Sequence, residues 1–321
     1  MKSTTGITIG FSVNPEIAFG FTDGEGKKGT LDFLSVELSG SSANVARCLM
    51  NMGHNPLLIV PSELGDSDEA NLLERALRKS GLLNVRLELL QRTSMAVYPI
   101  GDRRGSTSAL YGRKGERSSD PELLRKALEK IIGFDGQWRF ATAVNEDFLI
   151  PANCLLGEKP GFRVFGPNQT LCQDERFRTF SLSRSPINRC DLLIFNRFEF
   201  ETLGRTIEEI HDQGVSVVVV TDGAEGGVFS LRNSTGEATG SYEAVKPPEG
   251  SELFLIGAGD WFLGGLASYL VSHIENGGRG MSLLTMPSEV LQEACNFGAK
   301  VASRKITMRG GSNGPTRADL V

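Results

Sequence analysis

The chain has 321 residues, of which 40% are hydrophobic and 23% are charged, as in an ordinary globular protein with a large core. Its net charge of −5 gives no electrostatic reason to expect nucleic acid or an anionic membrane surface as a partner. The length admits one large α/β domain or two smaller ones. No apolar run reaches the roughly 18 residues of a membrane span and no signal peptide is evident, so we expect a cytoplasmic protein.

The cysteines and histidines form no pattern that is typical of a metal site. The five cysteines are odd in number, lie far apart and never form a Cys-x-x-Cys pair. A disulfide framework and a zinc site are therefore both disfavoured. The three histidines are equally scattered, and we expect each to lie on the surface or in a loop rather than to bind a metal.

The N-terminal part predicts one strand and then a region of short strands. Residues 7–11 form the first strand, and the loop 12–16 follows at its carboxyl end, the edge at which open α/β sheets bind ligands. Asn14 in this loop could hydrogen-bond a substrate hydroxyl, or it could simply start an Asn-Pro turn. Residues 17–38 carry several glycines among alternating apolar positions and predict short strands joined by turns.

Small residues at 39–43 precede an amphipathic helix that ends before Gly53. Small side chains at the start of a helix allow a ligand to approach the backbone closely. Asn44 lies in the first turn, where its amide could offer an acceptor and donors to sugar hydroxyls. It could equally help to cap the helix.

The middle of the chain alternates apolar strands with longer connections. The expected elements are a strand at 57–60, a helix at 68–79, a hairpin over 93–111, a helix at 121–132, and strands at 140–144, 163–165 and 192–195. Pro99 indicates that its strand lies at a sheet edge, because proline cannot donate to the hydrogen-bond ladder. Repeated strand, crossover and strand units predict a parallel sheet covered by helices.

Polar residues and glycines follow two of these strands. Asn196 and Glu199 come directly after the strand 192–195, where a carboxylate could position magnesium-bound water, although they could also be solvated loop residues. The valine-rich strand ending at Thr221 is followed by a turn with Gly223 and Gly226. Such a turn suits the edge of a nucleotide site, and it would also suit any tight connection.

The sequence Gly257-Ala258-Gly259-Asp260 stands directly before a long apolar helix. Its glycines allow a tight turn whose N–H groups, with the helix dipole, could hold a phosphoryl group. Asp260 could accept the proton of an attacking hydroxyl, or it could be an ordinary helix N-cap. Within the helix, Gly264 and Gly265 are expected to allow close packing against the sheet. A further helix is expected over 287–304.

Taken in order, these motifs resemble the ribokinase-like (phosphofructokinase B-type) carbohydrate kinase family. The resemblance spans nearly the whole chain and includes a closing Gly-Pro-Thr at 314–316. It implies a three-layer α/β/α sandwich with a mostly parallel central sheet, formed by residues 1–321 as one domain, and a small β-sheet lid from about 14–38 and 92–112. It also implies Mg²⁺-assisted transfer of the terminal phosphoryl group of ATP to a hydroxyl of a small sugar or sugar-like substrate.

The resemblance also implies roles for individual residues. By it, Asp260 is the catalytic base, and the backbone of Gly257, Ala258 and Gly259 is the anion hole. Further implied roles are substrate binding by Asn14, Gly40 and Asn44; phosphate and magnesium organisation by Asn196 and Glu199, the latter through water; and nucleotide contacts by Thr221, Gly223, Gly226 and Asn296.

The chain departs from the family pattern at several positions. Phe254 and Leu255 stand where the family often has Asp-Thr, which argues against activation by a monovalent cation. Ser39 replaces the first of two glycines, and Pro15-Glu16 replaces a common Asp, so we expect a substrate other than plain ribose or fructose. A non-catalytic nucleotide sensor and an ADP-dependent sugar kinase are the alternatives. Exposed strand edges in the lid make a homodimer through the lid plausible.

Overall fold

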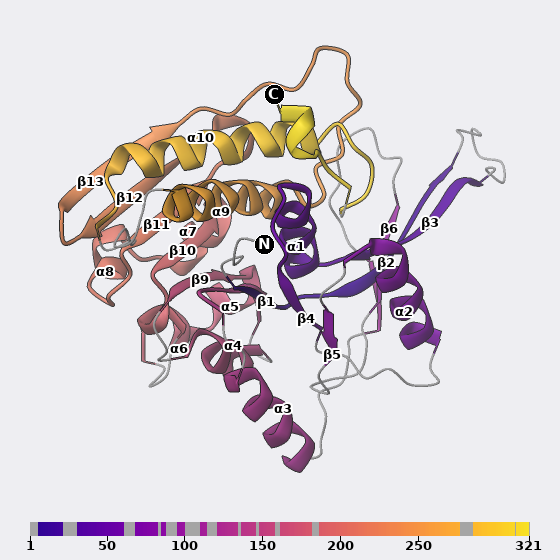
Figure 1. Cartoon of the computed structure of the whole chain (residues 1–321), viewed down its shortest axis with the longest axis horizontal. Helices are drawn as coiled ribbons and strands as arrows, with labels where there is room; N and C mark the ends of the chain where they lie inside the picture. The colour runs from indigo at the N-terminus through magenta and orange to yellow at the C-terminus, as the bar shows by residue number, and fades with distance from the viewer. Residues whose placement is uncertain are drawn as a thin grey trace.

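The computed structural model describes residues 6–21, 31–60, 68–82, 85–87, 95–99, 110–113, 121–133, 136–145, 148–157, 161–181, 186–276, 285–311 and 313–320. For some of these, Asn14 among them, it describes the backbone alone. The described strands form two sheets, one large and one small (Figure 1). Within this part of the chain, no helix combines the length and hydrophobicity that a membrane span requires.

The large sheet has nine described strands in the order β13-β12-β11-β10-β9-β8-β1-β4-β5. Every neighbouring pair from β11 to β5 is parallel, and β12 and β13 add an antiparallel edge. The strands are β1 (Ile7–Phe11), β4 (Leu57–Val60), β5 (Val85–Leu87), β8 (Trp138–Val144), β9 (Phe162–Pro167), β10 (Leu192–Asn196), β11 (Val217–Thr221), β12 (Gly227–Asn233) and β13 (Gly236–Tyr242).

Helices cover both faces of this sheet, which gives the expected three layers (Figure 1). One core cluster joins α1 and α9 to one face, and a second joins α4, α5 and α7 to the other. The described helices are α1 (Ser41–Asn51), α2 (Asp68–Ser80), α3 (Pro121–Gly133), α4 (Leu149–Leu156), α5 (Gln169–Gln173), α6 (Glu175–Arg178), α7 (Arg197–Leu203), α8 (Ile207–His211), α9 (Ala258–Asn276) and α10 (Ser288–Lys305).

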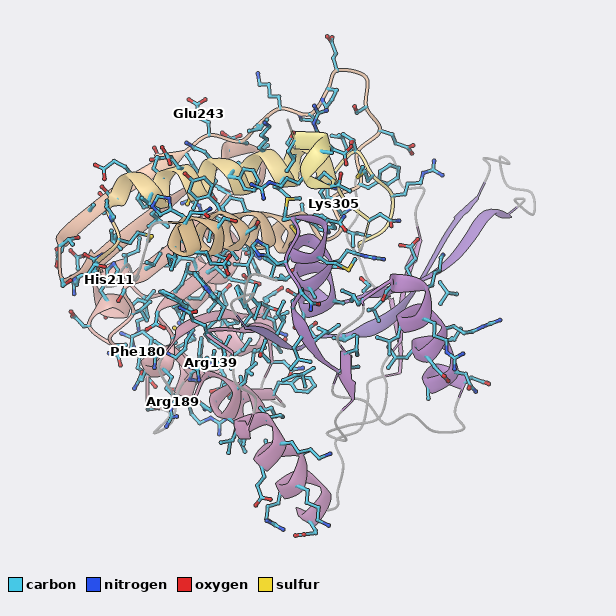
Figure 2. All side chains as sticks on the ribbon, viewed as in Figure 1. Arg139, Phe180, Arg189, His211, Glu243 and Lys305 are labelled. Carbon is cyan, nitrogen blue, oxygen red and sulfur yellow. The ribbon has the colours of Figure 1, made fainter. Side chains whose placement is uncertain are left out.

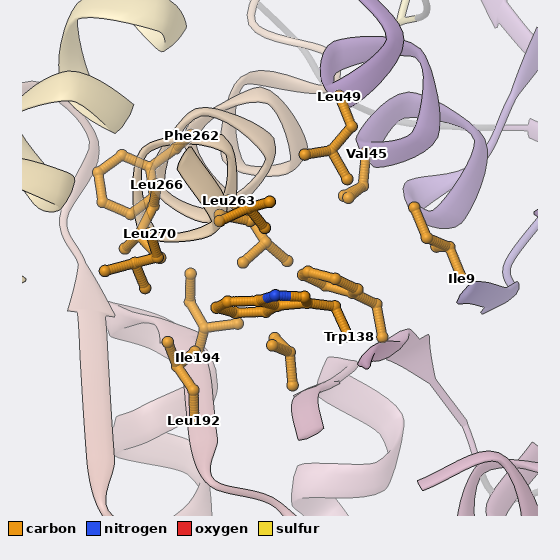
Figure 3. Packing of buried hydrophobic residues seen from close by; sticks show 14 of the residues in the cluster. Ile9, Val45, Leu49, Trp138, Leu192, Ile194, Phe262, Leu263, Leu266 and Leu270 are labelled. Carbon is orange, nitrogen blue, oxygen red and sulfur yellow. The ribbon is translucent and has the colours of Figure 1, made fainter. Parts of the chain in front are cut away.

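The central strands are continuous apolar runs because both of their faces are buried. In β10, Leu192 and Ile194 point into the cluster with α9, whereas Leu193 and Phe195 point into the opposite cluster. Figure 3 shows the first of these clusters, with the Trp138 ring lying between the strands and the helices. Side chains of alternating direction therefore build two cores from one strand.

Two glycines in α9 pack against helices, so the expectation that they face the sheet was wrong. A Cβ on Gly264 would lie 2.5 Å from the Cβ of Cys48 in α1, and one on Gly265 would lie 2.8 Å from Val301 in α10. Helix α9 thus packs between α1 and α10, whose side chains contact its backbone at these two glycines. This packing fixes its N-terminus, which carries Asp260, against the start of α1.

The small sheet has the order β3-β2-β6-β7, with β2 (Asn14–Phe21), β3 (Leu31–Ser39), β6 (Met95–Pro99) and β7 (Leu110–Arg113). Pro99 was expected on an edge strand, yet β6 lies between β2 and β7. The described pairs between β6 and β7 run from Met95 to Val97, and what faces Pro99 on that side lies outside the described residues. The lid role of this sheet and dimerisation through it stay predictions.

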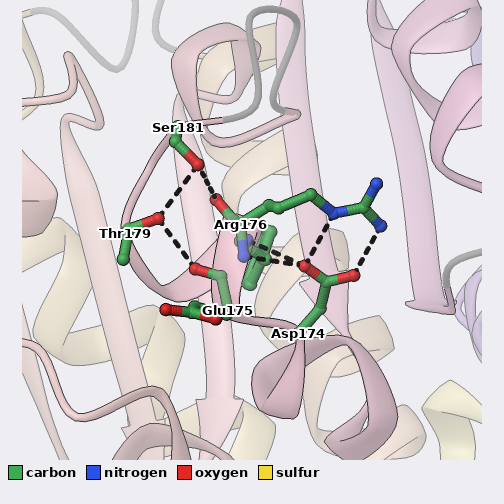
Figure 4. A network of polar contacts seen from close by, with 6 residues as sticks. Asp174, Glu175, Arg176, Thr179 and Ser181 are labelled. Atoms are coloured by element: carbon green, nitrogen blue, oxygen red, sulfur yellow. Dashed lines mark hydrogen bonds and ion pairs between the residues drawn. The ribbon is translucent and has the colours of Figure 1, made fainter.

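Short polar networks hold the connections around the large sheet. Asp174 caps α6 by accepting hydrogen bonds from the backbone N–H groups of Arg176 and Phe177, and it also pairs with the Arg176 guanidinium (Figure 4). His211, expected on the surface or in a loop, is instead buried at the end of α8 (Figure 2). Its ring nitrogens lie 2.7 Å from the Val215 carbonyl and 2.8 Å from the Ser230 hydroxyl.

Candidate active site

Asp260 lies in the first turn of α9, and its carboxylate accepts two hydrogen bonds from α1. The Ser41 hydroxyl donates to Oδ1 over 2.5 Å, and the Asn44 amide donates to Oδ2 over 2.7 Å. Asp260 lies 219 positions after Ser41 and 216 after Asn44 in sequence, yet the packing of α1 on α9 brings it to both. The carboxylate is held in one orientation by both contacts.

The start of α1 is built for close approach. Gly40 precedes the helix with a φ of 97°, a conformation that favours glycine, and its side-chain-free position leaves the first turn open. The Ser42 hydroxyl lies 2.9 Å from that of Thr142 and ties α1 to the end of β8. Asn44 is 2% exposed, and its Oδ1 is buried with no hydrogen-bond partner among the described residues. That oxygen can accept a hydrogen bond from a bound ligand.

The turn before α9 requires glycine at its first position. Gly257 has a φ of 79°, and a Cβ there would lie 2.8 Å from the Gly311 carbonyl and 3.2 Å from the Asn44 amide nitrogen. The N–H of Ala258 donates to the Leu255 carbonyl, whereas those of Gly259 and Asp260 have no acceptor among the described residues. The open donors at the N-terminus of this 19-residue helix therefore point to an anion-binding site.

A cavity of about 150 Å³ lies between the helix starts of α1 and α9 and the end of β10. Its walls include Asp260 and Gly259 from α9, Ser41 from α1, and Asn196 and Glu199 from the end of β10 and the start of α7. Asn196 and Glu199 form a reciprocal capping box, in which each side chain accepts from the other residue's backbone N–H. Glu199 uses Oε2 in this cap, and the Asn196 side chain also hydrogen-bonds its carboxylate.

The electrostatics of the two carboxylates follow from their burial. Burial raises the pKa of Asp260 above its ordinary value, while the hydrogen bonds from Asn44 and Ser41 and the charge of Lys305 lower it. Burial also raises the pKa of Glu199 to about 7, and the nearby Asp260 charge adds to this rise, whereas hydrogen bonds with Asn196 oppose it. Lys305, at the end of α10, is fully buried (Figure 2).

The expected nucleotide residues are divided between this cavity and its surroundings. Thr221 lines the cavity beside Asn196, its partner in the β10–β11 register. Gly223 begins the short 3₁₀ helix that follows β11 (Gly223–Glu225), and Gly226 follows its end with a φ of 85°. Asn296 is exposed on α10, where it accepts a hydrogen bond from Gln292, and it is not among the described lining residues.

Several residues at the site were missed by the sequence reasoning. Ser41 and Thr142 are ordinary small polar residues in the sequence, and only the tertiary packing brings Ser41 to Asp260 and Thr142 into the same cavity. Ala143, which also lines the cavity, has a φ of 49°, an uncommon conformation for a residue with a side chain. Arg197 pairs with Asp222 over 2.9 Å and bridges the loops after β10 and β11. No signal in the sequence distinguishes these positions.

No group of three or more His, Cys, Asp or Glu side chains that could hold a metal ion occurs within the described ranges. The side chain of Asn14 lies outside the described part of the structure, although its backbone begins β2 opposite Ser39. The expectation that Asn14 contacts substrate therefore stays a prediction.

Comparisons with known proteins agree on the architecture. The chain is similar to ribokinase from Giardia lamblia, with 16% identity over 99% of each chain and a TM-score of 0.72. It is also similar to Arabidopsis thaliana ribokinase complexed with ribose and ATP, with 18% identity over 99% of this chain and 97% of that chain and a TM-score of 0.66. Fructokinase from Vibrio cholerae O395, bound to fructose, ADP and calcium, shares 19% identity over 99% of this chain and 98% of its own, with a TM-score of 0.68.

At these identities the solved structures establish the fold alone. A search of curated proteins found no match. A family model described as pfkB family carbohydrate kinase matches residues 22–318, which is most of the chain. The chain belongs to the pfkB family of carbohydrate kinases.

Proposed function

We propose that this kinase transfers the terminal phosphoryl group of ATP to a hydroxyl of a sugar or sugar-like molecule, with Asp260 as the general base. The observation that carries the proposal is the position of Asp260. Its carboxylate lies at the N-terminus of α9, beside the open N–H groups, in one cavity with Glu199. A base, an anion site and a second carboxylate are the groups that in-line phosphoryl transfer needs.

Asp260 accepts the proton of the attacking hydroxyl in this mechanism. Hydrogen bonds from Ser41 and Asn44 fix its carboxylate, so the base does not have to reorient when the substrate arrives. Its raised pKa makes it a stronger base than an exposed aspartate, which favours proton transfer near neutral pH. No covalent intermediate with the protein is required.

The backbone at the start of α9 stabilises the negative charge of the transferred group. The N–H groups of Gly259 and Asp260 are the open donors there, and the positive end of the helix dipole reinforces them. Gly257 permits the turn, and the Ala258 N–H, which donates to Leu255, supports its geometry. In this proposal Gly257, Ala258 and Gly259 form the anion hole together, with the Asp260 N–H as a further donor.

The residues present fit a magnesium ion held mainly by phosphates and water. Mg²⁺ keeps several waters and uses one or two protein carboxylates, and the cavity is lined by the carboxylate of Glu199. When bound there, the ion supplies charge neutralisation to the phosphate oxygens. Glu199 would hold it through water, and Asn196 fixes Glu199 through the capping box.

Substrate and nucleotide are assigned to opposite sides of Asp260. The unpartnered Oδ1 of Asn44 suits a substrate hydroxyl donor, and Gly40 leaves room for the approach, with Asn14 as the further expected contact. Thr221 borders the cavity and would lie beside the phosphates of a bound nucleotide. Gly223, Gly226 and Asn296 are proposed to contact the nucleotide farther out. Because the chain departs from the family at Ser39, Pro15 and Glu16, we propose an acceptor other than plain ribose or fructose.

An acceptor screen tests this function. The chain is incubated with ATP and Mg²⁺ over a panel of sugars, sugar acids, polyols and nucleosides, and ATP consumption is measured, with ADP as donor in a parallel series. One strong acceptor with ATP is the expected result. Intact ATP binding without turnover on any acceptor would favour a non-catalytic sensor, and turnover with ADP alone would reassign the donor.

A further inference from the structure

A second pocket lies outside the proposed active site, between the end of α1, the C-terminal half of α9, the middle of α10 and the 3₁₀ helix at Arg317–Leu320. Its volume is about 480 Å³, within the roughly 300–1,000 Å³ that is usual for small-molecule sites. None of its described lining residues belongs to the cavity around Asp260. The catalytic proposal therefore leaves this pocket without a role.

The walls of the pocket combine aromatic rings with one positive charge. Tyr269 stacks on His273 with ring centroids 6.1 Å apart, and Phe297 lies 6.0 Å from Tyr269 on the facing helix. The Tyr269 hydroxyl donates to Glu293, which holds its ring in place. Arg317 is exposed, carries the one formal charge among the described lining residues, and has no ion-pair partner within the described ranges.

These groups select a class of ligand. Ring faces favour a planar aromatic molecule, because stacked or tilted aromatic pairs gain contact area and quadrupole attraction. An open guanidinium favours a carboxylate or phosphate, with which it can form two parallel hydrogen bonds. Ser272, three residues after Tyr269 on α9, adds a small polar side chain to the lining.

The pocket is mechanically connected to Asp260. Met52 and Phe297 line it and also pack in the cluster that contains Trp261, the neighbour of Asp260. The Trp261 indole N–H donates to the Gly311 carbonyl, the atom that Gly257 closely approaches. Tyr269 lies nine residues after Asp260 on the same helix, about 14 Å along its axis. A ligand that displaces Met52 or Phe297 would therefore shift Trp261, which contacts the same Gly311 carbonyl as the turn at Gly257.

We propose that this pocket binds a planar aromatic molecule carrying an anionic group, and that binding changes the rate of phosphoryl transfer through Trp261. The binding half of the proposal stands independently of the catalytic assignment. The regulatory half rests on the proposed role of Asp260.

Calorimetric titration of the full chain tests the binding half. AMP and nicotinate serve as probes, one a nucleotide and the other an aromatic carboxylate, and a non-hydrolysable ATP analogue is present at saturation to fill the donor site. At least one probe is expected to bind in a 1:1 ratio. Arg317→Gln should weaken binding about tenfold or more, because a charge-assisted hydrogen bond is lost, and Ser272→Phe should abolish it by filling the pocket.

Arg304→Gln is the matched control, since Arg304 is an exposed arginine on the neighbouring α10 that is not among the described lining residues. It should leave binding unchanged. Failure of both probes to bind the wild type, or binding that survives Arg317→Gln and Ser272→Phe alike, would overturn the site. If a thermal melt shows that Ser272→Phe does not fold, Arg317→Gln alone decides.

The regulatory half is tested by kinetics with the same probe. Bound probe should change kcat/KM about fivefold or more, as allosteric couplings commonly do, and Arg317→Gln should remove the effect. Tryptophan fluorescence should shift on binding, because Trp261 lies between the pocket and the catalytic turn. Binding without any change in kinetics would refute regulation while leaving the site intact. An active Asp260→Asn variant would refute the catalytic proposal and leave the binding result untouched.

Discussion

Glu199→Gln is expected to stabilise the folded chain above pH 7 and to leave its stability unchanged near pH 5. Glu199 is partly buried in the cavity with Asp260, and burial raises its pKa to about 7 from an ordinary value of 4.5. Between these two pH values the folded state keeps a proton that the unfolded state has lost. Stability therefore falls as pH rises from about 4.5 to about 7, and the deficit is complete above pH 7.

The magnitude follows from the two pKa values. Their difference corresponds to about 3 kcal/mol, and because the side chain keeps partial contact with water we expect about 1 to 2 kcal/mol. Glutamine removes the ionisable group but retains a side-chain oxygen that can accept from the Asn196 N–H, so the capping box survives. The variant should gain stability at pH 8 without losing its helix cap.

Urea denaturation at pH 5 and pH 8 measures this effect through the midpoint, provided the slope is unchanged. Glu209→Gln is the matched control, because Glu209 fills the same position in the Thr206 capping box of α8 but lies away from the cavity, with 43% of its side-chain surface exposed. Hydrogen bonding to Thr206 and pairing with Arg205 lower the pKa of Glu209, so its replacement should give no gain at pH 8. An equal midpoint shift for Glu199→Gln at both pH values would refute the burial argument.

Three further outcomes follow from the packing and hydrogen bonding. Asn44→Ala removes the 2.7 Å hydrogen bond to Asp260 and should lower kcat/KM about 10- to 100-fold, which steady-state kinetics can check. Gly264→Ala should cost about 1–3 kcal/mol in urea unfolding because its Cβ meets α1 at 2.5 Å. Gly259→Ala should leave the free energy of unfolding unchanged, because a Cβ at that position would meet no atom within 4 Å. Of the five thiols, Cys154 alone is not fully buried, so more than one fast-reacting thiol in the native protein would contradict the structure.

The layered fold could be predicted because its signals are local. The run Val217–Val220 indicates a strand buried on both faces, and the structure places its valines alternately in the two cores. The turn at Gly257–Asp260 is equally local, since glycines and a helix N-terminus are adjacent in sequence. Such features depend on neighbours within a few residues.

What could not be predicted from the sequence are the contacts between elements that are distant along the chain. Proline at 99 carries no information on whether β7 extends past it, and Gly264 carries none on which layer it will meet. Ser41 and Lys305 gain their roles only because α1 and α10 converge on the start of α9. The capping box at Asn196 was legible as an Asn-x-x-Glu pattern, but the sequence reasoning assigned it to a loop.

The most direct test of the account is the turnover of Asp260→Asn with the best acceptor, beside Asp212→Asn as a control at an exposed aspartate that is not among the described residues lining the cavity. Asparagine keeps the shape of Asp260 but cannot accept the hydroxyl proton, so turnover should fall about 10²- to 10⁴-fold while ATP and acceptor still bind. The control should retain most of its turnover. Near-normal turnover in Asp260→Asn would contradict the assignment of this residue as the general base.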